Sequence, residues 1–358
     1  MIFRTVASTA LLFYGTMDYG TMDCGTVELL LCGTVLFFRE TGKFPINIIR
    51  MKQEENITGW FTFFCALLLA FAAVTSFFTS PSHASEISAK AAVVVNSAND
   101  TLLYGKNPDL KLPPASTTKL ITAMVALDTL GPDEVITISK KAALTASVRP
   151  TLPRGEKLSV KDLLRLALIR SINGAAVALA EAAAGTEEAF VSLMNEKARS
   201  ISALNTRFIN ASGLPGEGQY TTARDLARIM KEALSYPLIA DIIHTATTAL
   251  DVKGKTVVLT NTNHLLLTDD GHLGGKTGYT RAARHCFVGA SDKEDGTLII
   301  ALLGDASRST LWTDAEKLLA RDFQEGTVII DAGEDSLGAK HQKAVHRTRE
   351  KRSRTKSL

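Results

Sequence analysis

The chain has 358 residues, of which 46% are hydrophobic and 22% are charged, proportions that exclude a disordered chain, a collagen-like repeat and a polytopic membrane protein. Its net charge of +3 is uneven, because residues 339–358 carry eight basic residues against Glu350 alone, which leaves −3 on residues 85–338. A slightly acidic body with a basic tail argues against nucleic acid as a partner.

The first fifty residues contain a tandem repeat that no known architecture uses. Residues 14–26 repeat a five-residue unit related to Tyr-Gly-Thr-Met-Asp. We interpret residues 1–50 as an upstream extension that results from a mis-assigned start, and we exclude them from the fold.

A secretory signal is expected next. The run 60–78 is almost wholly apolar, Met51 stands upstream of it, and Ser82-His83-Ala84 has small residues at the positions that a signal peptidase reads. We therefore predict a signal peptide over 51–84, and an uncleaved membrane anchor is the alternative, because nineteen residues nearly span a bilayer. Either reading places the body outside the cytoplasm, in the periplasm or the cell wall.

The body opens with a hairpin and a helix. Residues 91–95 and 101–104 are rich in β-formers and are joined by a turn-forming stretch. A helix is predicted over 116–130, entered through Pro113-Pro114 and ended at Gly131-Pro132.

Helices and then strands follow. Helical periodicity covers 159–170, 174–184, 187–203 and 222–235. Strands are predicted over 256–259, 286–290 and 297–303, with a hairpin turn over 291–296, and a last helix over 312–323. This order predicts an α/β fold whose sheet uses both ends of the body, with a helical insertion, rather than alternating βαβ units. Cys286 is expected to be a buried strand cysteine.

The first chemical signal is Ser116-Thr117-Thr118-Lys119. Its spacing puts a hydroxyl and an ammonium on one helix face. A serine needs a base to become a nucleophile, and a lysine can be that base when burial or nearby cations lower its pKa. A position in the first helical turn also points backbone N–H groups at a developing oxyanion.

Two further motifs complete an ordered set. Ser171-Ile172-Asn173 lies between two predicted helices, and Lys276-Thr277-Gly278 opens a β segment. The patterns of the first two motifs also occur by chance, at Ser353-Arg354-Thr355-Lys356 and at Ser97-Ala98-Asn99. The order and the spacing of the set of three motifs are therefore more informative than any single motif. Such a set is typical of class A β-lactamases and penicillin-binding proteins.

The body resembles the low-molecular-mass penicillin-binding proteins of the D-alanyl-D-alanine carboxypeptidase family over about residues 87–325. The segments that carry the resemblance, besides the motifs, are Leu112–Lys119, Gly185–Phe190 and Asn210–Leu214. The resemblance implies a β-lactamase/transpeptidase-like fold, an antiparallel sheet flanked by helices with an all-helical lobe. It implies a catalytic domain over 85–335 and no metal or organic cofactor. Residues 336–358 are predicted to be a basic disordered tail, because they are polar and lack periodicity.

The resemblance also implies roles in acyl transfer. Ser116 would attack the carbonyl between two D-alanines of a peptidoglycan stem peptide, and Lys119 would take its proton. Ser171 would relay a proton to the leaving amine, Asn173 would bind the substrate amide, and Lys276 would polarise Ser171. β-Lactams would acylate Ser116 as covalent inhibitors.

The segment Lys276-Thr277-Gly278-Tyr279-Thr280 is implied to bind the substrate. Lys276 and Thr277 would hold the substrate carboxylate. The N–H groups of Ser116 and Tyr279 would form the oxyanion hole. The glycine would let a substrate backbone approach closely.

The chain departs from the family pattern at three places. Ile172 and Gly174 replace the family's glycine and aspartate around Asn173, and Arg284 stands where a glycine is usual, where it would crowd the cleft or bind a carboxylate. Leu311 stands where the family often has an arginine, and Arg308 is close but shifted.

Several alternatives stay open at this stage. The main one is a D,D-endopeptidase that cuts peptidoglycan cross-links, and another is a non-catalytic scaffold whose basic tail binds anionic wall polymers or a membrane surface. A member that has lost catalysis is a further alternative. β-Lactamase activity is disfavoured because no Glu-Leu-Asn-type segment lies between Asn173 and Lys276. A zinc site from His264, His272 and His285 matches no zinc spacing.

Overall fold

The computed structural model describes residues 87–294, 296–323 and 328–331, and the backbone of three short strands near the N-terminus. The chain divides into two compact units, Met1–Ala84 and Ser85–Leu358. In the first unit, β1 (Leu29–Cys32), β2 (Val35–Phe38) and β3 (Ile49–Arg50) pair antiparallel in that order. The predicted signal segment and the basic tail lie outside the described residues, and no described helix is long and apolar enough to cross a membrane.

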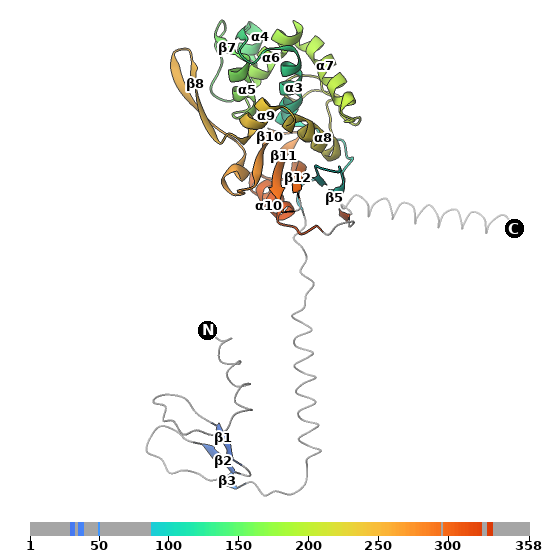
Figure 1. Ribbon diagram of the computed structural model, residues 1–358, viewed down its shortest axis with the longest axis vertical. Coiled ribbons are helices and arrows are strands. Elements are labelled where there is room, and N and C mark those ends of the chain that lie inside the picture. Colours follow the sequence, from blue (N-terminus) through green and yellow to red (C-terminus); the bar gives the residue numbers. More distant parts are fainter. Residues whose placement is uncertain are drawn as a thin grey trace, which may run out of the picture. The chain divides into compact units, whose positions relative to one another are not determined.

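A six-stranded sheet organises the second unit (Figure 1). In spatial order its strands are β10 (His272–Thr280), β11 (Arg284–Lys293), β12 (Gly296–Asp305), β4 (Ala91–Asn96), β5 (Leu102–Lys106) and β13 (Ile329–Asp331). All neighbours are antiparallel except β13, which runs parallel to β5. The chain ends of the body therefore meet in the middle of the sheet, where β12 pairs with β4, as the sequence predicts.

The two faces of the sheet bury separate hydrophobic cores. Ala91 and Val93 of β4 belong to the larger core, whereas the alternate residues Ala92 and Val94 belong to the smaller one. This period of two is what a strand covered on both faces requires. The smaller core is closed by α10 (Arg308–Leu319) and the larger one by the helical lobe and α8 (Ala223–Leu234).

The helical lobe lies at the top of the unit in Figure 1, above the strands of the large sheet. Its elements are the 3-10 helix η2 (Ala115–Thr118), α3 (Lys119–Thr129), α4 (Lys140–Leu144), α5 (Val160–Leu168), α6 (Asn173–Ala184) and α7 (Glu187–Ser200), with the small pair β6 (Val135–Thr137) and β7 (Lys157–Ser159). Ser159, Thr186 and Thr222 cap α5, α7 and α8 by accepting a backbone N–H three residues on. The helices predicted from periodicity are thus present.

Three further elements connect the lobe to the sheet. They are α9 (Pro237–His244), the hairpin of β8 (Thr247–Val252) and β9 (Lys255–Thr260), and the 3-10 helix η3 (His264–Leu267). Among them, the sequence predicts only part of β9, as the strand over 256–259.

The predicted position of the last helix is wrong by four residues. α10 begins at Arg308, not at residue 312, because Ser307 and Thr310 form a capping box at its start. The predicted turn over 291–296 is also too long, since β11 continues to Lys293 and pairs there with Gly296.

Candidate active site

The predicted nucleophile lies where a 3-10 turn leads into a helix. Ser116 is the second residue of η2, which continues directly into α3. The turn is held by the Thr117 hydroxyl, which donates to the Pro114 carbonyl at 2.7 Å. Gly213 makes the approach of the neighbouring chain feasible, because a Cβ at this position would lie 1.8 Å from the Ala115 carbonyl oxygen. The Ser116 side chain therefore stands at the N-terminal end of a buried helix.

Lys119 is fully buried beside Ser116. Its Nζ lies 2.9 Å from Ser116 Oγ, 2.7 Å from Asn173 Oδ1 and 2.6 Å from the Ser212 carbonyl oxygen. Burial, together with the nearby charge of Lys276, holds the pKa of Lys119 well below its usual range. A neutral amine donates two N–H bonds, which match the two carbonyl oxygens, and its lone pair then accepts the Ser116 hydroxyl. This geometry suits a general base.

A second lysine and serine face the first pair. Lys276 in β10 is buried, and its Nζ donates to Ser171 Oγ at 3.1 Å and to the Thr277 carbonyl at 2.9 Å. Desolvation lowers the pKa of Lys276 to about 7. Ser171 adopts a left-handed backbone with φ of 64°, in the turn between α5 and α6. The motif serine is therefore presented by a strained turn rather than by a helix face.

Asn173 begins α6 and links the lobe to the loop before α5. Its amide nitrogen Nδ2 donates to the Ala146 carbonyl at 2.7 Å, and its backbone N–H donates to Ser147 Oγ at 2.9 Å. With Oδ1 on Lys119, the side chain is held at both ends, which fixes its orientation at the edge of the site.

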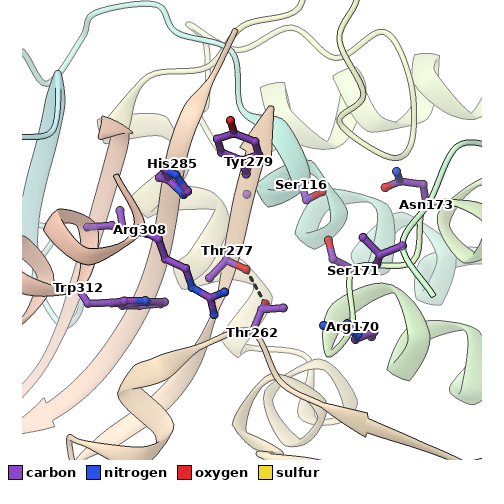
Figure 2. A pocket seen from close by; sticks show the side chains of 13 residues that line it. Ser116, Arg170, Ser171, Asn173, Thr262, Thr277, Tyr279, His285, Arg308 and Trp312 are labelled. Atoms are coloured by element: carbon purple, nitrogen blue, oxygen red, sulfur yellow. Dashed lines mark hydrogen bonds between the residues drawn. The ribbon is translucent and has the colours of Figure 1, made fainter. Parts of the chain in front are cut away.

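The strand β10 carries the third motif past the nucleophile. An ideal Cβ at Gly278 would lie 2.9 Å from both Ser116 N and Ala115 Cβ, so only glycine permits this approach. Thr277 shares a hydrogen bond with Thr262 (Figure 2). The Tyr279 side chain is 56% exposed, and its ring centre is 4.5 Å from that of His285.

Thr280 lies apart from the rest of its motif. Its hydroxyl accepts the Ala283 N–H at 3.0 Å and so closes the turn between β10 and β11. It lines a separate cavity of about 370 Å³ beside Gly213 and Glu217. The structure therefore does not bring Thr280 together with the other predicted site residues.

One cavity of about 390 Å³ joins the three motifs, within the range of small-molecule sites. Figure 2 shows the side chains that surround it. Its lining residues are Ser116, Val148, Arg170, Ser171, Asn173, Thr262, Thr277, Gly278, Tyr279, His285, Arg308, Leu311 and Trp312. The lining contains no carboxylate, whereas two arginines face it and the two lysines stand behind it.

The sequence drew attention to His285 as a zinc candidate and to Arg308 as a shifted arginine, and five polar or aromatic lining residues lie outside the predicted set of site residues. They are Arg170, Thr262, His285, Arg308 and Trp312. Arg170 directly precedes the motif serine Ser171, and this adjacency indicates that Arg170 lies near the same cavity. Thr262 lies between β9 and η3, and the others come from β11 and α10; the approach of these segments to β10 depends on long-range strand pairing.

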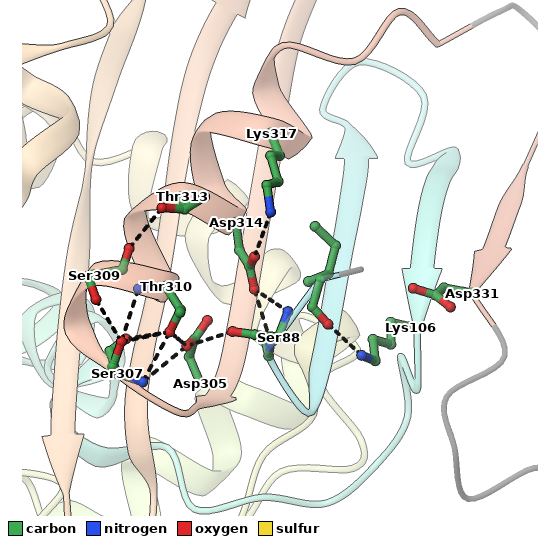
Figure 3. A network of polar contacts seen from close by, with 12 residues as sticks. Ser88, Lys106, Asp305, Ser307, Ser309, Thr310, Thr313, Asp314, Lys317 and Asp331 are labelled. Carbon is green, nitrogen blue, oxygen red and sulfur yellow. Dashed lines mark hydrogen bonds and ion pairs between the residues drawn. The ribbon is translucent and has the colours of Figure 1, made fainter. Parts of the chain in front are cut away.

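A polar network fixes the start of α10, the helix from which Arg308 lines the cavity (Figure 3). Asp305 accepts hydrogen bonds from the Ser88 hydroxyl at 2.9 Å and from Ser307 N at 3.3 Å, and also from the Thr310 hydroxyl. The network fastens the first turn of α10 to the chain before β4. Arg308 therefore supplies a positive charge to the cavity, although Leu311 occupies the position at which the family often has arginine.

Arg284 neither crowds the cleft nor faces it. It is exposed at the start of β11, is absent from the cavity lining, and adopts φ of 61°. That conformation favours glycine, which accounts for the glycine that the family usually has there.

The three histidines His264, His272 and His285 have separate surroundings. The His272 ring nitrogens contact Asn263 and Ser291, His264 lies beside Trp312, and His285 lies against Tyr279. Among the described residues, no group of three His, Cys, Asp or Glu side chains is placed to hold a metal ion. Cys286 is buried in β11, where burial raises the pKa of its thiol to about 12.

Comparisons with known proteins converge on one family. The model of the D-alanyl-D-alanine carboxypeptidase family matches residues 78–307. The D-alanyl-D-alanine carboxypeptidase DacF of Bacillus subtilis is 34% identical over 243 residues, which cover 66% of this chain and 62% of that protein. A D-alanyl-D-alanine endopeptidase of Pseudomonas aeruginosa is 36% identical over 65% of this chain and 76% of its own length.

The solved structures agree. A D-alanyl-D-alanine carboxypeptidase from Mycobacterium tuberculosis superposes with a TM-score of 0.63 at 30% identity, and the match covers 65% of this chain and 90% of that one. The Streptomyces K15 DD-transpeptidase gives a TM-score of 0.62 at 29% identity, over 65% of this chain and 96% of that one.

Proposed function

This chain belongs to the D-alanyl-D-alanine carboxypeptidase family of serine peptidases, and from that membership we propose that it removes the terminal D-alanine from peptidoglycan stem peptides. The predicted family and fold are confirmed. The observation that carries the proposed activity is the contact of the buried Lys119 with Ser116, because burial holds the pKa of this lysine well below its usual range. The chain covers less than two thirds of the Bacillus relative, so the activity is argued here from the site.

Acylation begins at Ser116. Lys119 accepts its hydroxyl proton while Oγ attacks the carbonyl between the two D-alanines. The proton passes to the leaving amine through Ser171, which Lys276 orients by its hydrogen bond. The N–H groups of Ser116 and Tyr279 are the proposed oxyanion hole, and the close packing of Gly278 on η2 supports this role because it brings both amides to one place.

The substrate carboxylate binds on the cationic side of the cavity. The Thr277 hydroxyl and the Arg308 guanidinium face this side, and Lys276 adds positive charge from behind (Figure 2). Asn173 lies at the opposite end, where it binds the amide of the acyl part. Water then hydrolyses the ester on Ser116. β-Lactams acylate the same oxygen, so they block the attack on the substrate.

Cleavage of cross-links by the same site is the second candidate. It is favoured by the relatives named D-alanyl-D-alanine endopeptidase in Pseudomonas aeruginosa and Escherichia coli, which are 36% and 34% identical to this chain. Both reactions break a bond that follows a D-alanine carbonyl, so they differ in the size of the leaving group.

One experiment tests these functions together. Purified 85–358 and its Ser116→Ala variant are incubated with a diacyl-L-Lys-D-Ala-D-Ala peptide, with a cross-linked muropeptide dimer, and with a β-lactam followed by mass spectrometry. We expect D-alanine release, a penicilloyl adduct on Ser116, and neither product from the variant. Faster cleavage of the dimer would favour the endopeptidase. An absence of both products and adduct would favour the non-catalytic scaffold.

The site of action is proposed to be outside the cytoplasm. The apolar run 60–78 and Ser82-His83-Ala84 support export by a signal peptide over 51–84. N-terminal sequencing of the protein from its host should find Ser85 first. An intact membrane-bound form would favour the anchor, and a cytoplasmic form that begins at Met1 or Met51 would contradict export.

A further inference from the structure

The cavity is more cationic than a single carboxylate requires. Its lining includes Arg170 and Arg308 and no acidic side chain, and Lys276 lies behind it. By contrast, Arg165 contacts Asp162 at 3.2 Å and Arg224 contacts Asp109 at 2.8 Å. An uncompensated cluster of like charge at a concave site favours an anionic ligand.

The two arginines approach the cavity from different elements. Arg308 begins α10, and Figure 2 shows its side chain extending toward Thr277 and Thr262. Arg170 follows α5, and Figure 2 shows it on the other side of Thr262, next to Ser171. Neither guanidinium forms a hydrogen bond or an ion pair with a described residue.

Their positions assign them to the leaving-group half of the site. In Figure 2, Thr277 lies beside Arg308 and Ser171 lies beside Arg170, and these two residues serve the carboxylate and the amine of the leaving group. Asn173 and Tyr279 lie toward the opposite side of the view. The left-handed turn at Ser171 presents Arg170 and Ser171 to the same cavity. A leaving D-alanine has one carboxylate, and Arg308 with Thr277 satisfies it.

We propose that Arg170 forms a second anion subsite, which selects a leaving D-amino acid with an acidic side chain. This inference rests on the proposed function. The α-carboxylate of the leaving residue binds Arg308 and Thr277, and the side-chain carboxylate binds Arg170 as a charge-assisted pair. The reaction is the same hydrolysis: the amide C–N bond breaks, Ser116 Oγ and then water bond to the carbonyl carbon, and the amine leaves with the relayed proton.

The test uses an isosteric pair of substrates. Diacyl-L-Lys-D-Ala-D-Glu and diacyl-L-Lys-D-Ala-D-Gln differ in side-chain charge alone, and the D-Ala-D-Ala peptide is the reference. For wild-type 85–358 we expect kcat/KM to be about tenfold higher for D-Glu than for D-Gln, as one charge-assisted bond provides. Arg170→Gln should bring this ratio close to one without slowing the D-Ala-D-Ala peptide more than about twofold.

Two other variants separate the roles. Arg308→Gln should slow all three peptides, because all share the α-carboxylate, and Arg199→Gln on exposed α7 should change nothing. A wild-type ratio near one, or a ratio that Arg170→Gln leaves unchanged, overturns the subsite while the proposed hydrolysis stands.

Binding to the Ser116→Ala variant, measured by calorimetry, separates the subsite from the chemistry. If wild-type protein cleaves none of the peptides, the proposed function fails. The subsite then stands only if Ser116→Ala binds the D-Glu peptide more tightly than the D-Gln peptide and the double variant with Arg170→Gln does not. Equal affinities overturn it.

Discussion

At the scale of single residues, burial gives two lysines different tasks. Lys119 is desolvated and lies near a second cation, so its pKa falls well below its usual range, which favours the neutral amine that a base requires. Lys276 is desolvated as well, but its pKa is about 7, so much of it is charged near neutrality. One lysine thus serves as a base and the other as a charge.

These pKa values predict a bell-shaped pH profile. The value of kcat/KM for a D-Ala-D-Ala peptide should rise as Lys119 loses its proton and fall above about pH 7 as Lys276 loses the charge that attracts the carboxylate. In Lys276→Arg the alkaline limb should disappear, because a guanidinium stays protonated. Lys119→Arg should fold but fail to acylate Ser116. An unchanged alkaline limb in Lys276→Arg would assign that limb to another group.

A second residue-scale prediction concerns backbone strain at Arg284. With φ of 61°, Arg284→Gly should raise the free energy of unfolding by about 1 kcal/mol, measured by denaturant titration. Activity should not change, because Arg284 is exposed and outside the cavity lining. Arg281→Gly is the matched control, since Arg281 lies in the same turn without a positive φ, and it should lose stability. Destabilisation by Arg284→Gly would show that its side chain makes a net favourable contact.

Residues inside short motifs could be placed from the sequence, and their partners could not. Ser116 and Lys119 are one helical turn apart, so local geometry is enough to predict their contact. Arg308 reaches the cavity only because β12 lies beside β11 and α10 folds back over the sheet, and no local pattern encodes that path. Thr280 shows the opposite error, since adjacency to a motif does not ensure that a side chain faces the same cavity.

At the scale of elements, the contact between β10 and η2 sets the width of the site. These elements come from opposite ends of the body, and they approach until the Gly278 position has no room for a side chain. The separation of the nucleophile from the substrate-binding strand is therefore determined by one missing Cβ.

This contact predicts the effect of Gly278→Ala. The added methyl would meet Ser116 N and Ala115 Cβ at 2.9 Å, so β10 must move away from η2. We expect β-lactam acylation of Ser116 to slow by about 100-fold, as a displacement on the order of 1 Å produces, with the fold retained by circular dichroism. Gly131→Ala is the control, because nothing lies within 4 Å of its added Cβ. Normal acylation by Gly278→Ala would mean that the contact does not set the geometry.

Long elements were predictable because their periodicity is strong, and short ones were not. The helices α5 and α8 carry apolar faces and capping residues that are readable locally. The pair β6 and β7, the helix α4 and the strand β13 have three to five residues each and depend on tertiary contacts. For α9, Pro237 at the first turn is a local signal of a helix start.

At the scale of the whole molecule, the second unit contains everything that the proposed chemistry needs. The cavity, both cores and the large sheet lie within residues 87–331. The last described strand, β13, adds to the exposed edge of β5, and its Asp331 accepts a hydrogen bond from the buried Tyr104 hydroxyl at 2.8 Å. The functional end of the domain is therefore expected after β13 and before the basic tail.

Truncation tests this boundary. The fragment 85–335 should match 85–358 in thermal stability and in hydrolysis of the soluble D-Ala-D-Ala peptide, because it keeps β13 and every residue of the cavity. The fragment 85–327 lacks β13, so it leaves the Tyr104 hydroxyl without its partner and should lose about 1–3 kcal/mol of unfolding free energy. Its kcat/KM at a temperature below its unfolding transition should be unchanged, since β13 is at the opposite edge of the sheet from β10.

A large loss of activity in 85–335 would show that residues 336–358 pack on the catalytic domain. Equal stability of the two fragments would show that β13 contributes little to the fold.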